Sequence, residues 1–163
     1  MNRVSAKPGR QAVALAALAA ILISVLGFLA TDLEGWYQTL VTPSWQPPDW
    51  LFGPIWMLIY SLTALAGVLA WHNAPEANAR SWILALFALN GFLNVLWSLL
   101  FFRLQRPDLA LAEIFLLWLS IVALIVGLRA FSKTTTWLLL PYLAWVTFAG
   151  VLNAAVVRLN PAF

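Results

Sequence analysis

The chain has 163 residues, of which 63% are hydrophobic and only 9% are charged. A soluble domain normally carries about a quarter charged residues, so this composition excludes a water-soluble globule. Cysteine is absent, which excludes disulfides, thiolate metal sites and cysteine nucleophiles. The net charge of +3 comes from scattered single basic residues and not from a basic stripe, so we expect no nucleic-acid partner.

Five long apolar runs follow one another along the chain, and each is nearly free of charge. Each run is long enough for a helix to cross about 30 Å of hydrocarbon. All the links but the first are short, which makes consecutive helices antiparallel neighbours. We therefore predict an all-α integral membrane protein, a compact bundle of five transmembrane helices that forms a single domain over residues 1–163. The expected helices cover residues 12–30, 51–71, 81–102, 109–128 and 134–157.

The basic residues divide unequally between the two sides of the expected bundle. Six lie on the side of the N-terminus and three on the other, which predicts an inside N-terminus and an outside C-terminus. The first run follows basic residues, as a secretory signal does, but residues 12–30 exceed the ~7 to 15 apolar residues of a signal core, so we expect this run to stay. The first group is Arg3, Lys7, Arg10, Arg80, Arg129 and Lys133, and the second is Arg103, Arg106 and Arg158.

The familiar catalytic arrangements are missing from this sequence. It contains no GxSxG, HExxH, Walker lysine or glycine-rich phosphate loop. His72 is the single histidine, and a metal site would need further histidine or cysteine partners that the chain does not have. We expect neither a metal site nor a cofactor.

Polar and aromatic residues recur at helical spacing in three of the runs, so each group shares one helix face. Amides that faced lipid would lose their hydrogen bonds, which predicts that these faces point inward. The asparagines either join helices to one another or orient a flat, mostly apolar ligand, and the accompanying rings favour a ligand cavity. The members are Trp56, Tyr60, Thr63 and Gly67 in the second run, Asn90, Asn94 and Trp97 in the third, and Tyr142, Trp145, Ala149 and Asn153 in the fifth.

Two further groups of residues have more than one interpretation. Glu113, the acid inside the fourth run, either snorkels to the interface or pairs with a partner near it, or else faces the cavity. Trp71, Trp82 and Trp137 lie at run ends, where tryptophans typically anchor a helix at the headgroup level.

The first loop, residues 31–50, is dense in aromatic rings and prolines. Prolines stiffen the backbone, so we expect an ordered, lid-like cover at the mouth of the bundle. The alternative is a loop that grips lipid headgroups with its tryptophans. The residues concerned are Trp36, Tyr37, Leu40, Pro43, Trp45, Pro47 and Pro48.

Four segments resemble the TspO/MBR family of tryptophan-rich sensory proteins and translocator proteins, in order and over nearly the whole chain. They are WYQTLVTPSWQPP (36–48), FGPIW (52–56), NVLWSLLFF (94–102) and PYLAWVTFAGVLN (141–153). The resemblance implies a five-helix membrane protein, often a homodimer, with a cavity closed by the first loop and, for a bacterial member, a place in the cell membrane. It also implies binding of porphyrins such as protoporphyrin IX and haem, and of related hydrophobic ligands.

The resemblance also implies which residues bind the ligand. In animal members a tyrosine follows the asparagine of the last helix in a cholesterol motif, and here Ala154 follows Asn153, so we do not expect specific cholesterol binding. Asn90 joins the ligand-binding set through its spacing alone, one turn before Asn94. The other expected ligand-binding residues are Tyr37, Pro47, Trp56, Tyr60, Asn94, Trp97, Trp145 and Ala149.

Three functions fit these residues. The first is a membrane receptor or sensor for porphyrins with a role in tetrapyrrole regulation or transport. The second is an enzyme-like, light-dependent oxidative breakdown of protoporphyrin IX, in which Trp56 and Trp145 would donate electrons. The third is a small transporter of hydrophobic molecules, for which the sequence offers no pair of buried charges.

Overall fold

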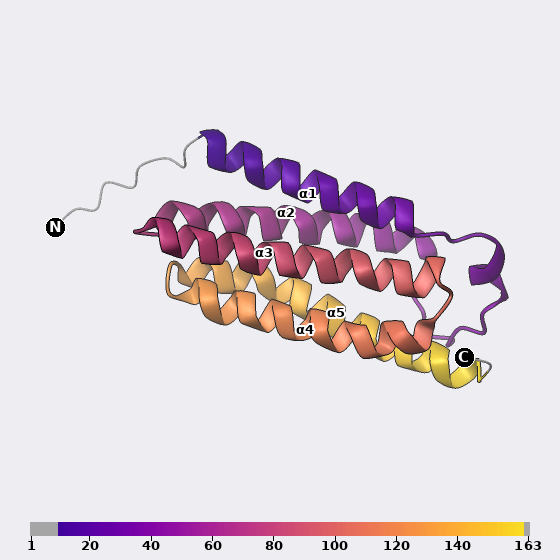
Figure 1. Cartoon of the computed structure of the whole chain (residues 1–163). Coiled ribbons are helices and arrows are strands. Elements are labelled where there is room, and N and C mark those ends of the chain that lie inside the picture. Colours follow the sequence, from indigo (N-terminus) through magenta and orange to yellow (C-terminus); the bar gives the residue numbers. More distant parts are fainter. Residues whose placement is uncertain (1–9, 162–163) are drawn as a thin grey trace.

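The computed structural model describes residues 10–161, and over them it is an all-α bundle of five long helices, as the apolar runs predict. The helices run alongside one another, and the first residue of α1 and the last of α5 lie at opposite ends of the bundle (Figure 1). Arg3 and Lys7, which the count of basic residues includes, lie outside the described residues. The elements are α1 (Arg10–Ala30), η1 (Gly35–Thr39), α2 (Asp49–Asn73), α3 (Ala77–Ser98), η2 (Leu99–Arg103), α4 (Pro107–Arg129) and α5 (Lys133–Leu159).

The helices extend beyond the apolar runs at most of their ends. For example, α2 begins at Asp49, α3 begins at Ala77 and α5 ends at Leu159. An apolar run stops at the first polar residue, but a helix continues through the polar interface until a residue caps or breaks it. Ser132 caps α5 by accepting a hydrogen bond from the main-chain N–H of Thr134.

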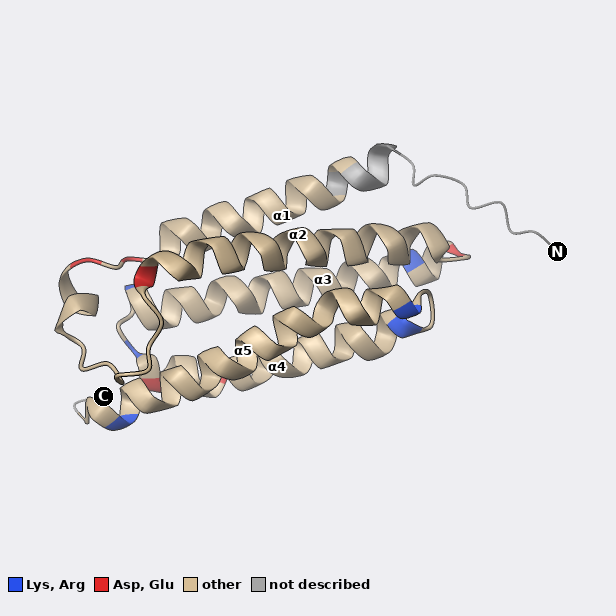
Figure 2. Cartoon of the chain, turned by 180° about the vertical axis from the view of Figure 1, so that it is seen from behind, with Lys and Arg blue, Asp and Glu red and all other residues tan. Residues whose placement is uncertain are grey.

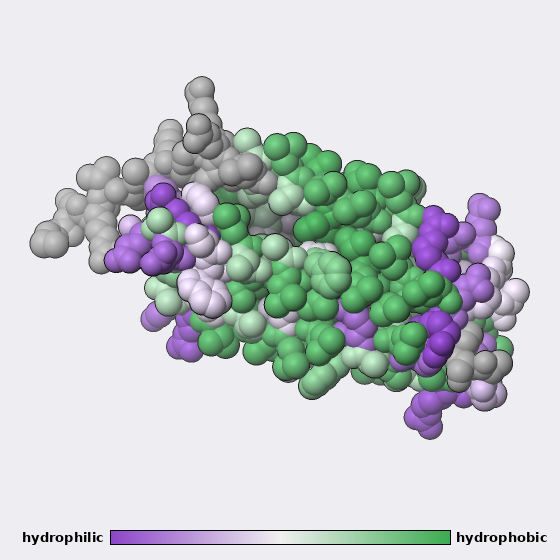
Figure 3. Space-filling view, in the orientation of Figure 1, coloured by the Kyte–Doolittle hydropathy of each residue, from purple (hydrophilic) through white to green (hydrophobic). Residues whose placement is uncertain are grey.

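Among the described residues, α2, α3 with η2, α4 and α5 are long and apolar enough to cross a membrane, and α1 contributes a shorter apolar stretch, Ala16–Ala30. The face of the molecule seen in Figure 3 is mostly hydrophobic in its middle, with hydrophilic residues gathered toward both ends. The charged residues accordingly gather at the ends of the bundle (Figure 2). Which end faces the cytoplasm stays a prediction.

The core lies between α2, α3, α4 and α5, and α1 lies outside it. The most extensive contacts join α4 to α5 and α3 to α4, whereas α1 packs mainly on α2 and less on α3. The central cluster of buried apolar side chains draws on α2 to α5 and includes Ile59, Leu93, Ile114, Ile121 and Val146. Among the described side chains of α1, only Gly27 and Ala30 are buried. The first helix is therefore a wall on one side of a four-helix core (Figure 1).

Gly91 of α3 permits a close contact with α1. A Cβ atom added at Gly91 would lie 2.5 Å from the Cδ1 atom of Ile23, so a larger residue would force that side chain to move. Small residues are common at contacts between lipid-embedded helices. The hydrophobic effect does not drive such helices together, so they associate through close van der Waals packing.

The first loop is ordered by contacts with two helix ends. Trp36 packs edge-on against Phe101 and Tyr37 packs against Phe102, both in η2. The Val41 main-chain N–H donates to Asn160 Oδ1, and Asn160 Nδ2 donates back to the Val41 carbonyl, each at 2.9 Å. The loop thus joins the C-terminal end of α5 to the end of α3.

We expect Asn160→Ala to release the first loop. The variant loses both hydrogen bonds to Val41. A loss of about 1 kcal/mol in the free energy that holds the loop closed raises the population of molecules with an open first loop roughly fivefold. Limited proteolysis with an enzyme that cuts after aromatic residues should therefore cleave the loop about five times faster, because cleavage follows the open population when opening is rapid. Asn78→Ala, an exposed change in the first turn of α3, is the control. Equal cleavage of the two variants would contradict the assigned contact.

Candidate functional site

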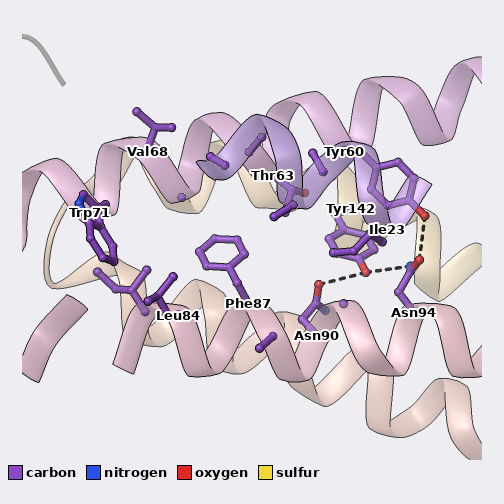
Figure 4. A pocket seen from close by; sticks show the side chains of 18 residues that line it. Ile23, Tyr60, Thr63, Val68, Trp71, Leu84, Phe87, Asn90, Asn94 and Tyr142 are labelled. Atoms are coloured by element: carbon purple, nitrogen blue, oxygen red, sulfur yellow. Dashed lines mark hydrogen bonds between the residues drawn. The ribbon is translucent and has the colours of Figure 1, made fainter. Parts of the chain in front are cut away.

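A cavity of about 260 Å³ lies between α1, α2 and α3, with one residue of α5 in its wall (Figure 4). Most of the residues that line it are apolar, and the polar ones are Tyr60, Thr63, Asn90, Asn94 and Tyr142. Its apolar lining includes Ala16, Ala20 and Ile23 of α1, Ala64, Gly67 and Trp71 of α2, and Leu84 and Phe87 of α3.

The cavity is long because its lining follows helical spacing. On α2 the lining extends from Tyr60 to Trp71, which corresponds to about 16 Å at 1.5 Å per residue. Trp71 and Leu84 lie at one end, Tyr60 and Asn94 lie at the other, and the Phe87 ring lies between them (Figure 4). The arrangement suits an elongated or flat molecule.

A directed chain of hydrogen bonds forms the polar end of the cavity. Tyr60 OH donates to Asn94 Oδ1 (2.7 Å), and Asn94 Nδ2 donates to Tyr142 OH (3.1 Å). Tyr142 OH then donates to Asn90 Oδ1 (3.3 Å). Asn90 Nδ2 donates to Ser120 Oγ (2.8 Å), which donates to a main-chain carbonyl of α4 (2.7 Å). This hydrogen-bonded chain therefore joins α2, α3, α5 and α4.

Hydrogen-bonding capacity is left over at the cavity. Within the described part of the chain, Asn90 and Asn94 each donate one hydrogen bond from the amide nitrogen, and an amide has two N–H groups. Thr63 Oγ1 is buried and has no hydrogen-bond partner among the described residues. A buried polar atom without a partner costs free energy. A ligand with hydrogen-bond acceptors next to an apolar body would satisfy these groups.

The structure places only some of the expected ligand-binding residues at this cavity. Tyr60, Asn90 and Asn94 line it, and all three belong to the hydrogen-bonded chain. Trp56 does not line it but stacks on Tyr60, with 5.3 Å between ring centroids, and meets Tyr142 edge-on.

The other expected residues lie in separate contacts. Trp97 stacks on Phe101 and donates from Nε1 to Asn153 Oδ1 at 3.2 Å. Trp145 packs against the rings of Phe52 and Phe148. Its Nε1 atom is buried without a partner among the described residues. Ala149 packs against the central core cluster.

The two expected residues of the first loop, Tyr37 and Pro47, are half-buried and do not line the cavity. Tyr37 OH donates to Asp49 Oδ1 at 3.0 Å and accepts from Gln46 Nε2 at 3.1 Å. Burial, followed by the charge and the hydrogen bond of Asp49, raises the pKa of Tyr37 to about 12. These contacts hold the loop to the start of α2.

Sequence reasoning missed several residues of the cavity. Phe87 lies three residues before Asn90 and seven before Asn94, so the spacing on α3 could have found it. Trp71 lines the cavity and does not serve only as an interface anchor, whereas Trp82 and Trp137 are 71% and 72% exposed, as the anchor interpretation expects. Ala16 and Ala20 of α1 lie four residues apart on one helix face, which indicates close packing, but this spacing does not show that the face forms a cavity wall over α2 and α3.

Glu113 follows neither of its two interpretations. Its side chain is only 5% exposed, so it does not reach the interface, and it does not line the cavity. Neither carboxyl oxygen has a hydrogen-bond partner among the described residues. The packing of α4 against its neighbours encloses this residue, although it lies less than two turns from the start of the helix.

Comparisons with known proteins agree with this fold. A model of the TspO/MBR family matches residues 12–159. The chain is 42% identical over 136 residues to the tryptophan-rich protein TspO of Chlorobaculum tepidum. The aligned residues cover 82% of this chain and 85% of that protein. It is 40% identical to the Archaeoglobus fulgidus protein of the same name (88% and 93% covered) and 34% identical to the translocator protein of Bos taurus (82% of each). Together with the membrane-spanning helices, these relatives show an integral, multi-pass membrane protein.

Removing the Tyr142 hydroxyl should destabilise the bundle more than removing that of Tyr60. Tyr60→Phe removes the hydrogen bond at one end of the hydrogen-bonded chain, and in a membrane protein such a loss lowers the free energy of unfolding by about 0.6 kcal/mol. Tyr142→Phe removes two bonds in the middle, so we expect about twice that loss. Thermal unfolding of the two purified variants in the same detergent measures the difference. Equal losses would mean that one of the two hydrogen bonds assigned to Tyr142 does not contribute to stability.

The contribution of Tyr37 to stability should disappear at alkaline pH. Its pKa of about 12 lies above the ordinary value of about 10, so this contribution is complete below pH 10 and is lost as the pH rises through 12. The difference in phenolate absorbance between wild type and Tyr37→Phe, followed against pH, should have its midpoint near 12. A midpoint near 10 would show that Tyr37 is neither buried nor held by Asp49 as the structure has it.

Proposed function

Because the chain belongs to the TspO/MBR family of membrane sensor and receptor proteins, we propose that it binds flat, largely apolar ligands in the cavity between α1, α2 and α3. Porphyrins such as protoporphyrin IX and haem are the ligand class that the family resemblance implies. The observation that carries this proposal is the chemistry of the cavity, in which apolar walls end at amide groups with unused N–H donors. Small-molecule sites typically combine apolar walls with a few orienting polar groups.

The rings in the wall support a flat ligand. Phe87 and Trp71 offer aromatic surfaces along the length of the cavity, and Tyr60 offers a third at the polar end. Stacking on such rings contributes about 0.5 to 1.5 kcal/mol beyond the burial of area. The walls supplied by α1 are mostly alanine, which leaves room beside these rings.

A ligand as large as a porphyrin needs more room than the cavity has. About 260 Å³ lies just below the ~300 to 1,000 Å³ of typical small-molecule sites. The wall that can yield is α1, because few of its described side chains are buried and it lies outside the four-helix core. Binding would thus move α1 outward, which supplies a conformational signal suited to a sensor.

The geometry supports binding more than the light-dependent breakdown of protoporphyrin. The two tryptophans assigned to that reaction, Trp56 and Trp145, do not line the cavity. Trp145 lies among Phe52 and Phe148, and Trp56 is separated from the cavity by the Tyr60 ring on which it stacks.

We expect Ala64→Phe to weaken protoporphyrin IX binding by at least about tenfold, or about 1.4 kcal/mol, because the added ring occupies the cavity. Leu65→Phe is the matched control, since Leu65 is the next residue on α2, is 47% exposed and does not line the cavity. It should change the affinity by less than about threefold. Quenching of tryptophan fluorescence in detergent measures both, and thermal unfolding checks that both variants are folded.

Trp145→Phe shows whether the ligand instead lies beneath the first loop. If the ligand occupies the cavity, this variant binds protoporphyrin IX as the wild type does. A large loss in Trp145→Phe, together with unchanged binding by Ala64→Phe, would place the ligand among the loop-proximal rings and refute the cavity as the site.

A further inference from the structure

Arg80 stands at the end of the cavity that is opposite the hydrogen-bonded chain. It lies in the first turn of α3, and its guanidinium carbon is 5.5 Å from the centroid of the Trp71 ring. Trp71 itself lines the cavity at that end (Figure 4). A cation over an aromatic face is held by the ring's quadrupole and keeps its N–H donors available at the edges of the guanidinium plane.

Arg80 continues the face of α3 that lines the cavity. It precedes Ile83 and Leu84 by three and four residues, and both of these line the cavity. Residues with these spacings lie on the same side of a helix, one turn apart. The cavity-lining face of α3 therefore ends in a positive charge.

In the part of the chain that the structure describes, no carboxylate pairs with that charge. Arg103 and Arg106, at the other end of the bundle, pair with Asp32 and Asp108. Among the described residues, no carboxylate lies within 4.0 Å of Arg80, although Glu76 precedes it by one turn. Arg80 is exposed and can accept an anionic partner from outside the chain.

The surroundings of Arg80 favour an anion at the membrane surface. Trp82, two residues later, is 71% exposed, and tryptophans of this kind mark the headgroup level. The first turn of α3 has no side-chain cap, so its free N–H groups add positive potential to that of Arg80.

We propose that the cavity selects acidic amphiphiles, whose carboxylate or phosphate group pairs with Arg80 while the apolar body lies along the cavity toward Asn94. This inference rests on the proposed function and refines it, because it states the charge and orientation of the ligand. For a porphyrin, the edge that carries the carboxylates faces Arg80, and the apolar ring lies along the cavity beside Phe87. A fatty acid or an anionic lipid has the same two features.

The test compares protoporphyrin IX with its dimethyl ester, which has the same ring and no carboxylates. Arg80→Gln should weaken binding of the acid about fivefold, the scale of a partly exposed ion pair, and should leave binding of the ester unchanged. Arg80→Lys should restore most of the affinity for the acid. Arg129→Gln is the control, because Arg129 is exposed in the last turn of α4, at the same end of the bundle, and does not line the cavity.

The outcomes separate this inference from the proposed function. Equal weakening of acid and ester by Arg80→Gln, or no weakening of either, overturns the ion pair and leaves the cavity as the site. Failure of the wild type to bind either compound, or unchanged binding by Ala64→Phe, overturns the proposed function and this inference with it.

Nanodiscs distinguish the two sources of the anion. If phosphatidylglycerol, added to phosphatidylcholine discs, competes with protoporphyrin IX in the wild type but not in Arg80→Gln, lipid headgroups also occupy the Arg80 site. If it does not compete while the acid remains sensitive to Arg80→Gln, the site takes the carboxylates of the porphyrin alone. Both results support the proposal, and competition of equal strength in the two proteins contradicts it.

Discussion

The need to satisfy polar groups inside a lipid-embedded bundle governs this structure. Amides on α3 cannot face hydrocarbon without loss of free energy, and they find partners only on other helices. Asn94 and Asn90 therefore meet Tyr142, and the chain of hydrogen bonds reaches Tyr60 on one side and Ser120 on the other. Four helices are drawn together at one level of the bundle, and the central cluster of apolar side chains forms around that level.

None of the described side chains of α1 belongs to this hydrogen-bonded chain. The helix accordingly lies outside the four-helix core. It packs on α2 and α3 through small residues, and its larger side chains mostly face outward. The space that remains between α1 and the four-helix core is the cavity. The same hydrogen bonds that hold the core together thus form the polar end of the cavity, and the helix that they do not bind forms one of its walls.

The two ends of the cavity differ in chemistry. At the inner end, neutral amides offer N–H donors in a buried setting, where an unpaired charge would be costly. At the outer end, the guanidinium of Arg80 lies over Trp71 near the membrane surface, where water can solvate its charge. A ligand with an anionic end would place that end at Arg80 and not among the buried amides, which fixes its orientation. In the proposed site, the membrane would therefore contribute to selectivity, because it determines where a charge can reside.

The sequence by itself determined the five helices and the inward faces of the second, third and fifth, because long apolar runs and helical spacing are local properties. Tyr60, Asn90 and Asn94 could be assigned to the site for that reason. The tertiary structure alone decided that Trp97, Trp145 and Ala149 lie elsewhere and that alanines of α1 form a wall. Spacing tells which face of a helix a residue occupies, but not which neighbouring helix meets that face at each level. That depends on how all five helices pack together.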